Sequence, residues 1–321
     1  MYKPPYEITS LILKLIQQIA KELGFLQGAK IKTSPLYLRK KNKIKTIQSS
    51  LSIEGNSLSI DQMTALLEGK RIIAPEKDIT EVQNAIRTYN IINQYNPLLP
   101  QDLLKAHKLM MASLIADNGR WRGISVGIIK GDKIAHIAPP AKRVPHLINE
   151  LFEFINYNND VPWLIKACIF HYELEFIHPF SDGNGRIGRL WQQLLLMKED
   201  SIFEYIPIET LVKNKQQEYY DVLSKCDEVG NSTLFIEFML NQILSSLQIY
   251  SNNIVSEIND PKSRILYAQQ YFKMSWFSRK QYILLHKNIS SATASRDLKQ
   301  GILDGHLTPN GTKNQTFYKF T

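Results

Sequence analysis

The chain has 321 residues, of which 44% are apolar and 21% charged, which excludes a disordered or fibrous protein and indicates a globular chain of two or three domains. No apolar run approaches the roughly 18 residues of a membrane span, and the start of the chain lacks the apolar core of a signal peptide, so we expect a cytoplasmic protein. The formal net charge of +9 suits ATP, nucleic acid or an acidic protein surface, without choosing among them.

Residues 1–95 are predicted to be helical. Apolar residues recur at helical spacing from Ile8 to Leu26, and a basic run over 39–45 enters a further helix, where we interpret it as a solvated face. That helix is expected to stop at Gly55. Ser59 and Gln62 then have capping-box spacing ahead of another apolar run, which predicts the start of the next helix.

After two more amphipathic helices, over 77–95 and 101–114, the pattern changes to strands. Residues 124–129 and 133–137 flank Gly131-Asp132, which predicts a β-hairpin. His136 lies on its second strand. We interpret it as a hairpin side chain rather than as a second catalytic residue.

The stretch Ile177–Leu190 carries the chemistry. Two apolar helical runs are separated here by Pro179 and by Gly183–Gly185, which predicts a helix, a tight loop and a second helix. Such a loop is an anion site, because the first N–H groups of the second helix have no acceptor within it and the helix dipole favours negative charge there. The N–H groups expected to point outward are those of Gly183, Asn184 and Gly185.

Charged and polar side chains surround this predicted anion site. Arg186 and Arg189 lie three residues apart and so share a helix face, which adds two permanent cations. Asp182 is a hard oxygen ligand suited to Mg²⁺. His178, at the edge of the loop, is placed to accept a proton from an incoming hydroxyl. Together these residues indicate a site for phosphoryl or nucleotidyl transfer.

A rival chemistry uses the helix before the loop. His171, Glu175 and His178 fall at intervals of four and three and therefore share a face, where they could bind Zn²⁺ for a hydrolysis. Pro179, the two arginines and the phosphate-type loop argue against this hypothesis. The alternative roles are a satisfied core histidine for His171 and a packing carboxylate for Glu175.

From His178 to Arg189 the chain resembles the Fic family, whose signature is His-Pro-Phe-x-Asp/Glu-Gly-Asn-Gly-Arg-x-x-Arg, and it meets every fixed position. The resemblance implies a mainly α fold, a helical core over 96–258 with a β-hairpin flap. It also implies transfer of AMP from ATP to a Tyr, Ser or Thr hydroxyl of a protein, with His178 as base and Asp182 holding Mg²⁺. The phosphate-binding residues it implies are Gly183, Asn184, Gly185, Arg186, Ile187, Gly188 and Arg189.

Ser50-x-x-x-Glu54-Gly55 is similar to the inhibitory motif of one Fic class. A carboxylate of Glu54 placed on Arg189 would occupy the cation that should orient the γ-phosphate of ATP. The resemblance therefore implies an inhibitory helix within the N-terminal region, its motif being residues 50–55.

Two further features are similar to the family. The hairpin resembles a flap that adds the target segment as a β-strand, which implies target docking by Ile134, Ala135, His136 and Ile137. Tyr219 stands where the family often has a tyrosine at the adenine or ribose, whereas Asp227 or a neighbour replaces an asparagine that some members carry.

Residues 259–321 form the last predicted domain, which begins with a linker, Asn259-Asp260-Pro261. Three short helices, over 263–271, 278–286 and 291–302, precede two strands around Asn310-Gly311, an order that resembles a winged helix-turn-helix domain. The residues that could meet DNA phosphates are Arg296, Lys299 and Lys313. Docking of a protein, or formation of a homodimer, is an equally open role.

Two alternative functions remain open at this stage. The chain could be a DNA-binding regulator whose Fic core senses a nucleotide, or it could remove AMP from a protein, with Glu54 positioning water. Self-modification is a further expectation for an adenylyltransferase of this kind. The target protein cannot be identified from the sequence.

Overall fold

The fold is described from a computed structural model, which describes residues 3–28, 36–130, 133–286, 289–312 and 316–321. The chain divides into two compact units, Met1–Gln248 and Ile249–Thr321. The division falls inside helix α11 (Thr233–Asn259), before the linker expected at Asn259. Among the described residues, no helix is both long and apolar enough to cross a membrane.

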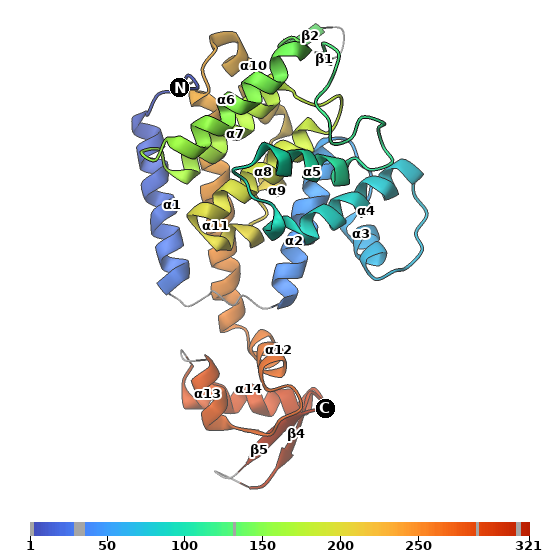
Figure 1. The fold of residues 1–321 in the computed structure, drawn as a ribbon. Coiled ribbons are helices and arrows are strands. Elements are labelled where there is room, and N and C mark those ends of the chain that lie inside the picture. The colour runs from blue at the N-terminus through green and yellow to red at the C-terminus, as the bar shows by residue number, and fades with distance from the viewer. Residues whose placement is uncertain (1–2, 29–35, 131–132, 287–288, 313–315) are drawn as a thin grey trace. The chain divides into compact units, whose positions relative to one another are not determined.

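The described residues of the first unit form helices and one hairpin, so the expected mainly α fold is confirmed (Figure 1). Its helices, in chain order and ahead of α11, are α1 (Ser10–Gly28), α2 (Leu36–Ile53), α3 (Ile60–Leu67), α4 (Glu76–Asn90), α5 (Pro100–Met110), α6 (Val144–Tyr157), α7 (Trp163–Ile177), α8 (Asn184–Glu199), α9 (Ile208–Asn214) and α10 (Gln216–Val229). Short 3-10 turns lie at Ile92–Gln94, Ala141–Arg143 and Ser201–Tyr205.

Helices α7 and α8 form the centre of this unit. The sequence of α7 is apolar on nearly every side, so the helix is buried all round. It packs along α8, whose Trp191 is fully buried against Phe152 and Phe170. Gly188 permits this packing, because a Cβ there would lie 3.1 Å from the His171 ring. The end of α7 and the start of α8 are therefore held by the core.

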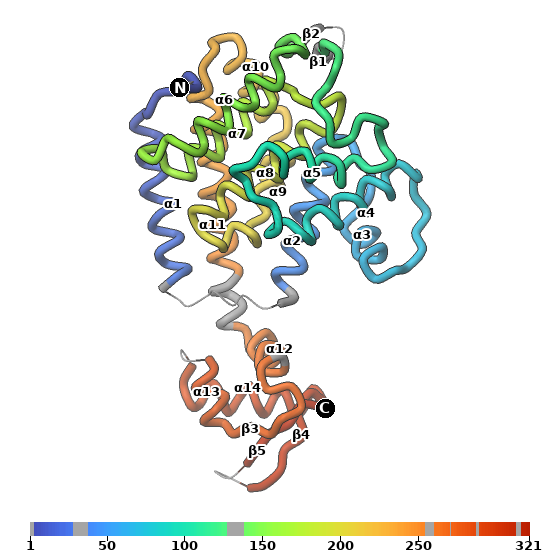
Figure 2. The backbone as a smooth tube through the Cα atoms, viewed as in Figure 1, coloured from blue at the N-terminus to red at the C-terminus, as the bar shows by residue number. Residues whose placement is uncertain are grey.

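Segments from the N-terminal region surround the start of α8. Helix α2 packs against α4, α8 and α9, and α5 packs against both α4 and α8 (Figure 2). Helix α2 ends at Ile53, and Gly55 follows with a φ of +90° that favours glycine. The predicted capping box is present, because Ser59 accepts a hydrogen bond from the Gln62 N–H while the Gln62 side chain accepts one from the Ser59 N–H.

The hairpin consists of β1 (Gly127–Lys130) and β2 (Lys133–Ile137), paired antiparallel. Its first strand starts later than the expected residue 124. The turn Gly131-Asp132 and the side chains of residues 127–137 lie outside the described part of the structure, and with them the docking roles predicted for Ile134, Ala135, His136 and Ile137.

The second unit has a core of its own. Helices α12 (Pro261–Phe272), α13 (Arg279–His286) and α14 (Ser291–Leu303) accompany a sheet of order β3-β5-β4. Its strands are β3 (Phe277–Ser278), β4 (Leu307–Asn310) and β5 (Phe317–Phe320), and the core includes Ile265, Phe277, Tyr282, Leu298, Leu307 and Phe320. The expected helices and strands are present, and β3 is an addition. The winged-helix assignment itself stays a prediction.

Candidate active site

The loop between α7 and α8 has a tightly determined backbone. His178 ends α7 in the left-handed region, with a φ of +49°, and Gly183 precedes α8 with a φ of +87°. Asn184 closes the loop, since its side-chain oxygen accepts from the Phe180 N–H and its amide donates to the Phe180 carbonyl, both at 2.9 Å. The Phe180 ring is fully buried and anchors the loop in the core.

Several of the residues predicted for phosphate binding have other contacts in this structure, and their role toward phosphate stays a prediction. Both ends of the Asn184 amide are occupied by Phe180, and the Gly183 N–H donates to Asp182 Oδ1 at 2.6 Å. The Ile187 N–H bonds to the Gly183 carbonyl inside the helix, and Gly188 serves helix packing. The donors that fit an anion are therefore the backbone N–H groups of Asn184, Gly185 and Arg186, the first three of α8.

His107 on α5 supports the loop. Nothing in the sequence pattern had indicated this role for His107. Its Nδ1 accepts from the Gly119 N–H at 2.9 Å, so its Nε2 carries the proton and donates to the Asp182 carbonyl at 2.9 Å. The ring also stacks on Phe180, with 3.7 Å between centroids. Burial lowers the pKa of His107, which agrees with a neutral ring in this double role.

Arg122 holds the other side of the loop. Its guanidinium donates to the carbonyl oxygens of His178 (2.7 Å), Ile177 (3.3 Å), Ile124 (2.8 Å) and Pro139 (2.5 Å). Its own N–H donates to the Pro179 carbonyl at 2.9 Å. Arg122 is 2% exposed. One buried cation thus joins the end of α7, the active loop and the two ends of the flap segment.

Arg189 meets the end of α2. Its Nη2 lies 2.6 Å from Glu54 Oε1 and 3.0 Å from the Ser50 carbonyl oxygen, and its Nε donates to Ser50 Oγ at 3.0 Å. Burial alone would lower the pKa of Arg189, but Glu54 and the other anionic groups nearby raise it, so the cation is firmly retained. Gly185 makes room for this contact, because a Cβ there would lie 2.4 Å from Glu54 Oε1.

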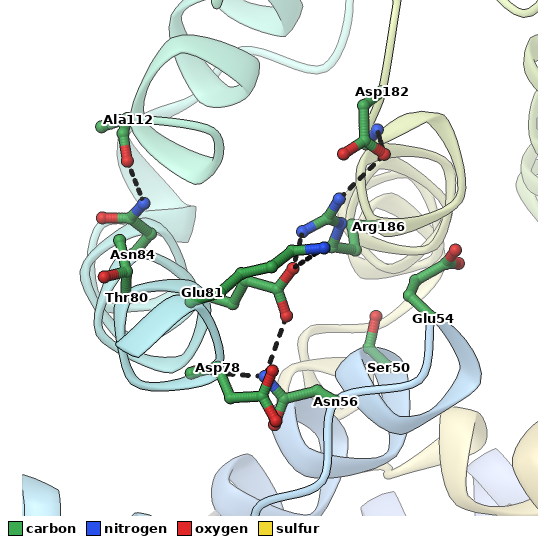
Figure 3. Close-up of polar contacts among 12 residues, drawn as sticks. Ser50, Glu54, Asn56, Asp78, Thr80, Glu81, Asn84, Ala112, Asp182 and Arg186 are labelled. Carbon is green, nitrogen blue, oxygen red and sulfur yellow. Dashed lines mark hydrogen bonds and ion pairs between the residues drawn. The ribbon is translucent and has the colours of Figure 1, made fainter. Parts of the chain in front are cut away.

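Arg186 is buried between two carboxylates (Figure 3). Its Nη2 lies 3.0 Å from Asp182 Oδ1, and its Nη1 lies 3.2 Å from Glu81 Oε1 on α4. The side chain of Asp182 is 52% exposed, whereas that of Glu81 is 7% exposed. Sequence reasoning missed Glu81, since its partner is 105 residues away and acidic residues are ordinary on an amphipathic helix.

His178 is half-buried at the edge of the loop. Its Nδ1 lies 3.4 Å from the Glu175 carbonyl oxygen. A carbonyl only accepts, so this weak contact places the ring proton on Nδ1 and makes Nε2 the basic nitrogen. His178, the predicted base, thus lies beside the start of α8, which carries both arginines; its role as base stays a prediction.

The zinc hypothesis is not supported by the geometry. His171 Nδ1 donates to Gln192 Oε1 at 2.8 Å, and Nε2 accepts from the Tyr219 hydroxyl at 3.1 Å, so both ring nitrogens are occupied. Within the described part of the chain, no cluster of three His, Cys, Asp or Glu could hold a metal. Tyr219 is itself 1% exposed. It contacts His171 behind the site, and its role toward a nucleotide stays a prediction.

Asp182 fits Mg²⁺ of the kind that accompanies a nucleotide. Mg²⁺ is commonly bound by one or two carboxylates together with phosphate oxygens and water. Asp182 Oδ2 lies on a half-exposed side chain, beside the helix N-terminus where phosphate would bind. A single carboxylate is therefore enough for this metal, and it is too few for an all-protein site.

The site combines the N-terminus of α8, two buried arginines and a histidine at its edge, an arrangement that suits phosphate groups. A model of the Fic/DOC family matches residues 97–196. A Fic family protein from Desulfovibrio desulfuricans is 34% identical and has a TM-score of 0.77, with 100% of this chain and 98% of that chain covered. The chain therefore belongs to the Fic/DOC family.

Other relatives are more distant. Protein adenylyltransferase fic-1 of Caenorhabditis briggsae is 26% identical over 74% of this chain, which spans about half (46%) of that protein. A probable protein adenylyltransferase of Aquifex aeolicus is 24% identical over 78% of this chain and 81% of its own length. The solved Fic-1 of C. elegans, 20% identical with a TM-score of 0.62, shares the fold over 77% of this chain and 72% of that chain.

Proposed function

We propose that this chain is a protein adenylyltransferase, which transfers AMP from ATP to a Tyr, Ser or Thr hydroxyl of a protein. The observation that carries the proposal is the joint placement of His178 and two buried arginines around the N-terminus of α8. The names of the relatives support the same reaction class. The reaction needs phosphate-binding groups and a base, and it needs no covalent enzyme intermediate. The site contains candidates for both kinds of group.

In the proposed reaction, His178 Nε2 accepts the proton of the target hydroxyl while its oxygen attacks the α-phosphorus. The new O–P bond forms as the bond to the β-phosphate oxygen breaks, and pyrophosphate leaves. Arg186 and Arg189 bind the β- and γ-phosphates, and the first N–H groups of α8 stabilise charge on the phosphate oxygens. Mg²⁺, when bound at Asp182, would supply further charge neutralisation to the phosphates.

We infer that the chain is inhibited by its own Glu54. The carboxylate lies 2.6 Å from Arg189 Nη2, in the place where a γ-phosphate oxygen would have to be. An ATP molecule that cannot place its γ-phosphate there presents its α-phosphate in the wrong orientation for attack. Inhibition is then intramolecular, and it needs no second protein.

Intact-mass spectrometry after incubation with ATP and Mg²⁺ tests both parts of this proposal. The Glu54→Gly variant should gain the mass of one or more AMP groups, since adenylyltransferases of this kind label themselves, and the unmodified sequence should gain far less. The absence of AMP from Glu54→Gly, even with a mixture of candidate proteins present, would reject the transfer reaction. Equal labelling of both proteins would reject inhibition by Glu54.

A second candidate function, DNA binding by the second unit, is favoured by the distribution of charge. Residues 261–321 contain ten Lys and Arg against two Asp and Glu, so they hold +8 of the chain's formal +9. Arg264 and Asp297 neutralise each other in a buried pair, 2.6 Å apart, which fastens α12 to α14. Arg296 and Lys299 are exposed on α14, whereas Lys313 lies outside the described residues. This charge suits a phosphate backbone.

Fluorescence anisotropy with a labelled duplex tests this second function. The paired substitution Arg296→Ala with Lys299→Ala should weaken binding and reduce the salt dependence by about two released ions. Lys14→Ala with Lys21→Ala, a matched charge change on exposed residues of α1, should leave binding unchanged. No binding at low salt, or equal losses in both double variants, would reject a DNA surface on α14.

A further inference from the structure

Glu81 is a buried carboxylate with both oxygens engaged (Figure 3). Its Oε1 lies 3.2 Å from Arg186 Nη1, and its Oε2 accepts from Asn56 Nδ2 at 2.9 Å. The side chain is 7% exposed. A carboxylate buried to this degree is costly unless it is paired and hydrogen-bonded, so both contacts help to hold it in place.

Arg186 shares its charge between this carboxylate and Asp182, the proposed ligand of Mg²⁺. The two partners differ in freedom, because Asp182 is half-exposed on a loop and Glu81 is buried on α4. When Asp182 turns toward a metal, Arg186 loses one of its anions. Glu81 then remains to hold the guanidinium at the start of α8, where a phosphate can reach it.

Asn56 fixes the orientation of the Glu81 carboxylate. Its Nδ2 also donates to the Asp78 carbonyl at 3.1 Å, while its Oδ1 accepts from the Leu58 N–H at 3.1 Å. The amide cannot be turned round, because its oxygen would then face the carboxylate. Asn56 follows Glu54 by two residues, and its own N–H closes the end of α2 on the Leu51 carbonyl.

We propose that Glu81 is a positioning residue for nucleotide and metal, which keeps Arg186 from competing with Mg²⁺ for Asp182. This inference rests on the proposed binding of Mg·ATP at this site. Without a carboxylate at 81, Arg186 keeps Asp182 as its anionic contact among the residues described around it. Breaking that contact when the metal binds would then leave the guanidinium without a carboxylate. With Glu81 present, Arg186 keeps one anionic partner when Asp182 turns away, so it competes less strongly with the metal.

The test replaces Glu81 by Gln in the Glu54→Gly background, where the nucleotide site is unobstructed. A glutamine keeps an oxygen for Asn56 but presents an uncharged amide to Arg186. Titration calorimetry of ATP binding at graded Mg²⁺ should show the half-saturating Mg²⁺ concentration raised roughly tenfold, the size usual when a group that orients a metal ligand is lost. Glu81→Asp, which keeps the charge, should give a smaller shift in the same direction and serves as the test if the glutamine variant does not fold.

Asn84→Ala is the matched control. Asn84 lies on the same helix and is equally buried, and it donates to the Ala112 carbonyl at 2.7 Å, so its loss removes a structural contact without touching Arg186. It should lower Tm and leave the Mg²⁺ dependence unchanged. An unchanged Mg²⁺ dependence in both Glu81 variants, or the same change in Asn84→Ala, would overturn the positioning role. A shifted Mg²⁺ dependence without any AMP transfer would support that role and reject the proposed reaction.

Discussion

Arg186 and Arg189 are both buried on α8, yet their counter-ions differ in how readily they can be displaced. Glu54, which neutralises Arg189, is 33% exposed and lies at a helix end, whereas Glu81, which neutralises Arg186, is 7% exposed within a helix. Loss of Glu54 therefore frees a cation for a ligand. Loss of Glu81 leaves a buried cation poorly compensated. Removal of the carboxylate is therefore expected to raise activity at Glu54 and to lower it at Glu81.

We expect His178→Ala to abolish transfer while nucleotide binding persists. General-base catalysis typically contributes about 10²–10⁴-fold, and the imidazole acts on the hydroxyl rather than on the phosphates. In the Glu54→Gly background, the rate should fall by at least about a hundredfold with the ATP affinity from calorimetry little changed. His146→Ala, an exposed histidine on α6, should have no effect. A His178→Ala enzyme that transfers AMP at the parental rate would show that another group is the base.

Glu209 should make stability fall as pH rises. Burial raises its pKa to about 7, partly opposed by Arg189 and a hydrogen bond from Thr46, and its Oε2 has no partner among the described atoms. A carboxyl whose pKa is raised on folding stabilises the fold below its ordinary pKa of about 4.5 and loses that contribution as pH passes 7. Glu209→Gln should therefore gain stability over the parent, on the order of 2 kcal/mol at pH 8 and little at pH 4, in urea unfolding. A difference that does not change with pH would contradict the assignment.

At the scale of elements, the loop between α7 and α8 is held by side chains from other segments of the chain. His107 on α5 supports it through Asp182 and Phe180, and Arg122 supports it through His178. Both side chains are buried, and both act on backbone carbonyls. The position of His178, the proposed base, is thus held by a segment that precedes the hairpin, and Arg122 contacts the carbonyls of both His178 and Pro139.

Arg122→Lys should show how much this support matters. A lysine has one ammonium group in place of a planar fork, so it cannot reach carbonyls on three segments at once. In the Glu54→Gly background, we expect a large fall in kcat with a smaller change in the KM for ATP, and a lower Tm, since each unsatisfied carbonyl costs about 1–3 kcal/mol. Arg120→Lys, at an exposed position two residues earlier, should be neutral. Equal kinetics in the two variants would remove Arg122 from any role in placing His178.

The elements that sequence reasoning predicted well are those whose signals are local. Apolar periodicity, Pro179 and the glycine pair were enough to place α7, the loop and α8, and capping chemistry placed the start of α3. Glu81, His107 and Arg122 were not predictable in this way. Their partners lie 105, 75 and 56 residues away. The packing of α5 on α8 and of α4 on α5 brings the first two to the site, and Arg122 reaches it from the loop after α5.

At the scale of the whole molecule, the chain has two separate cores. The first surrounds α7 and α8, and the second lies between the three helices and the sheet of residues 261–320. Charge is also divided unequally, because the second unit, residues 249–321, has ten Lys and Arg against four Asp and Glu and so holds +6 of the formal +9. The proposed nucleotide chemistry therefore belongs to the first unit, and the proposed binding of DNA belongs to the second.

Leu298→Ala should destabilise the second unit alone. Leu298 is 1% exposed in that core, and truncation of a buried leucine typically costs about 2–5 kcal/mol. We expect two calorimetric transitions, of which one moves down in temperature while the one raised by Mg·ATP stays in place. Leu196→Ala, on α8, should do the reverse. One transition that moves as a whole in both variants would show that the two cores unfold together.

In the proposed inhibition, the end of α2 takes the place of the γ-phosphate of ATP at Arg189. It brings to Arg189 a carboxylate and the Ser50 carbonyl, and it turns the negative end of its own helix dipole toward the positive end of α8. Because one positive potential attracts both the tethered mimic and the free nucleotide, a mutation that strengthens that potential tightens both. Under the proposed inhibition, affinity for ATP and strength of inhibition therefore rise together, and they can be separated only by changes in how well the end of α2 fits against Arg189.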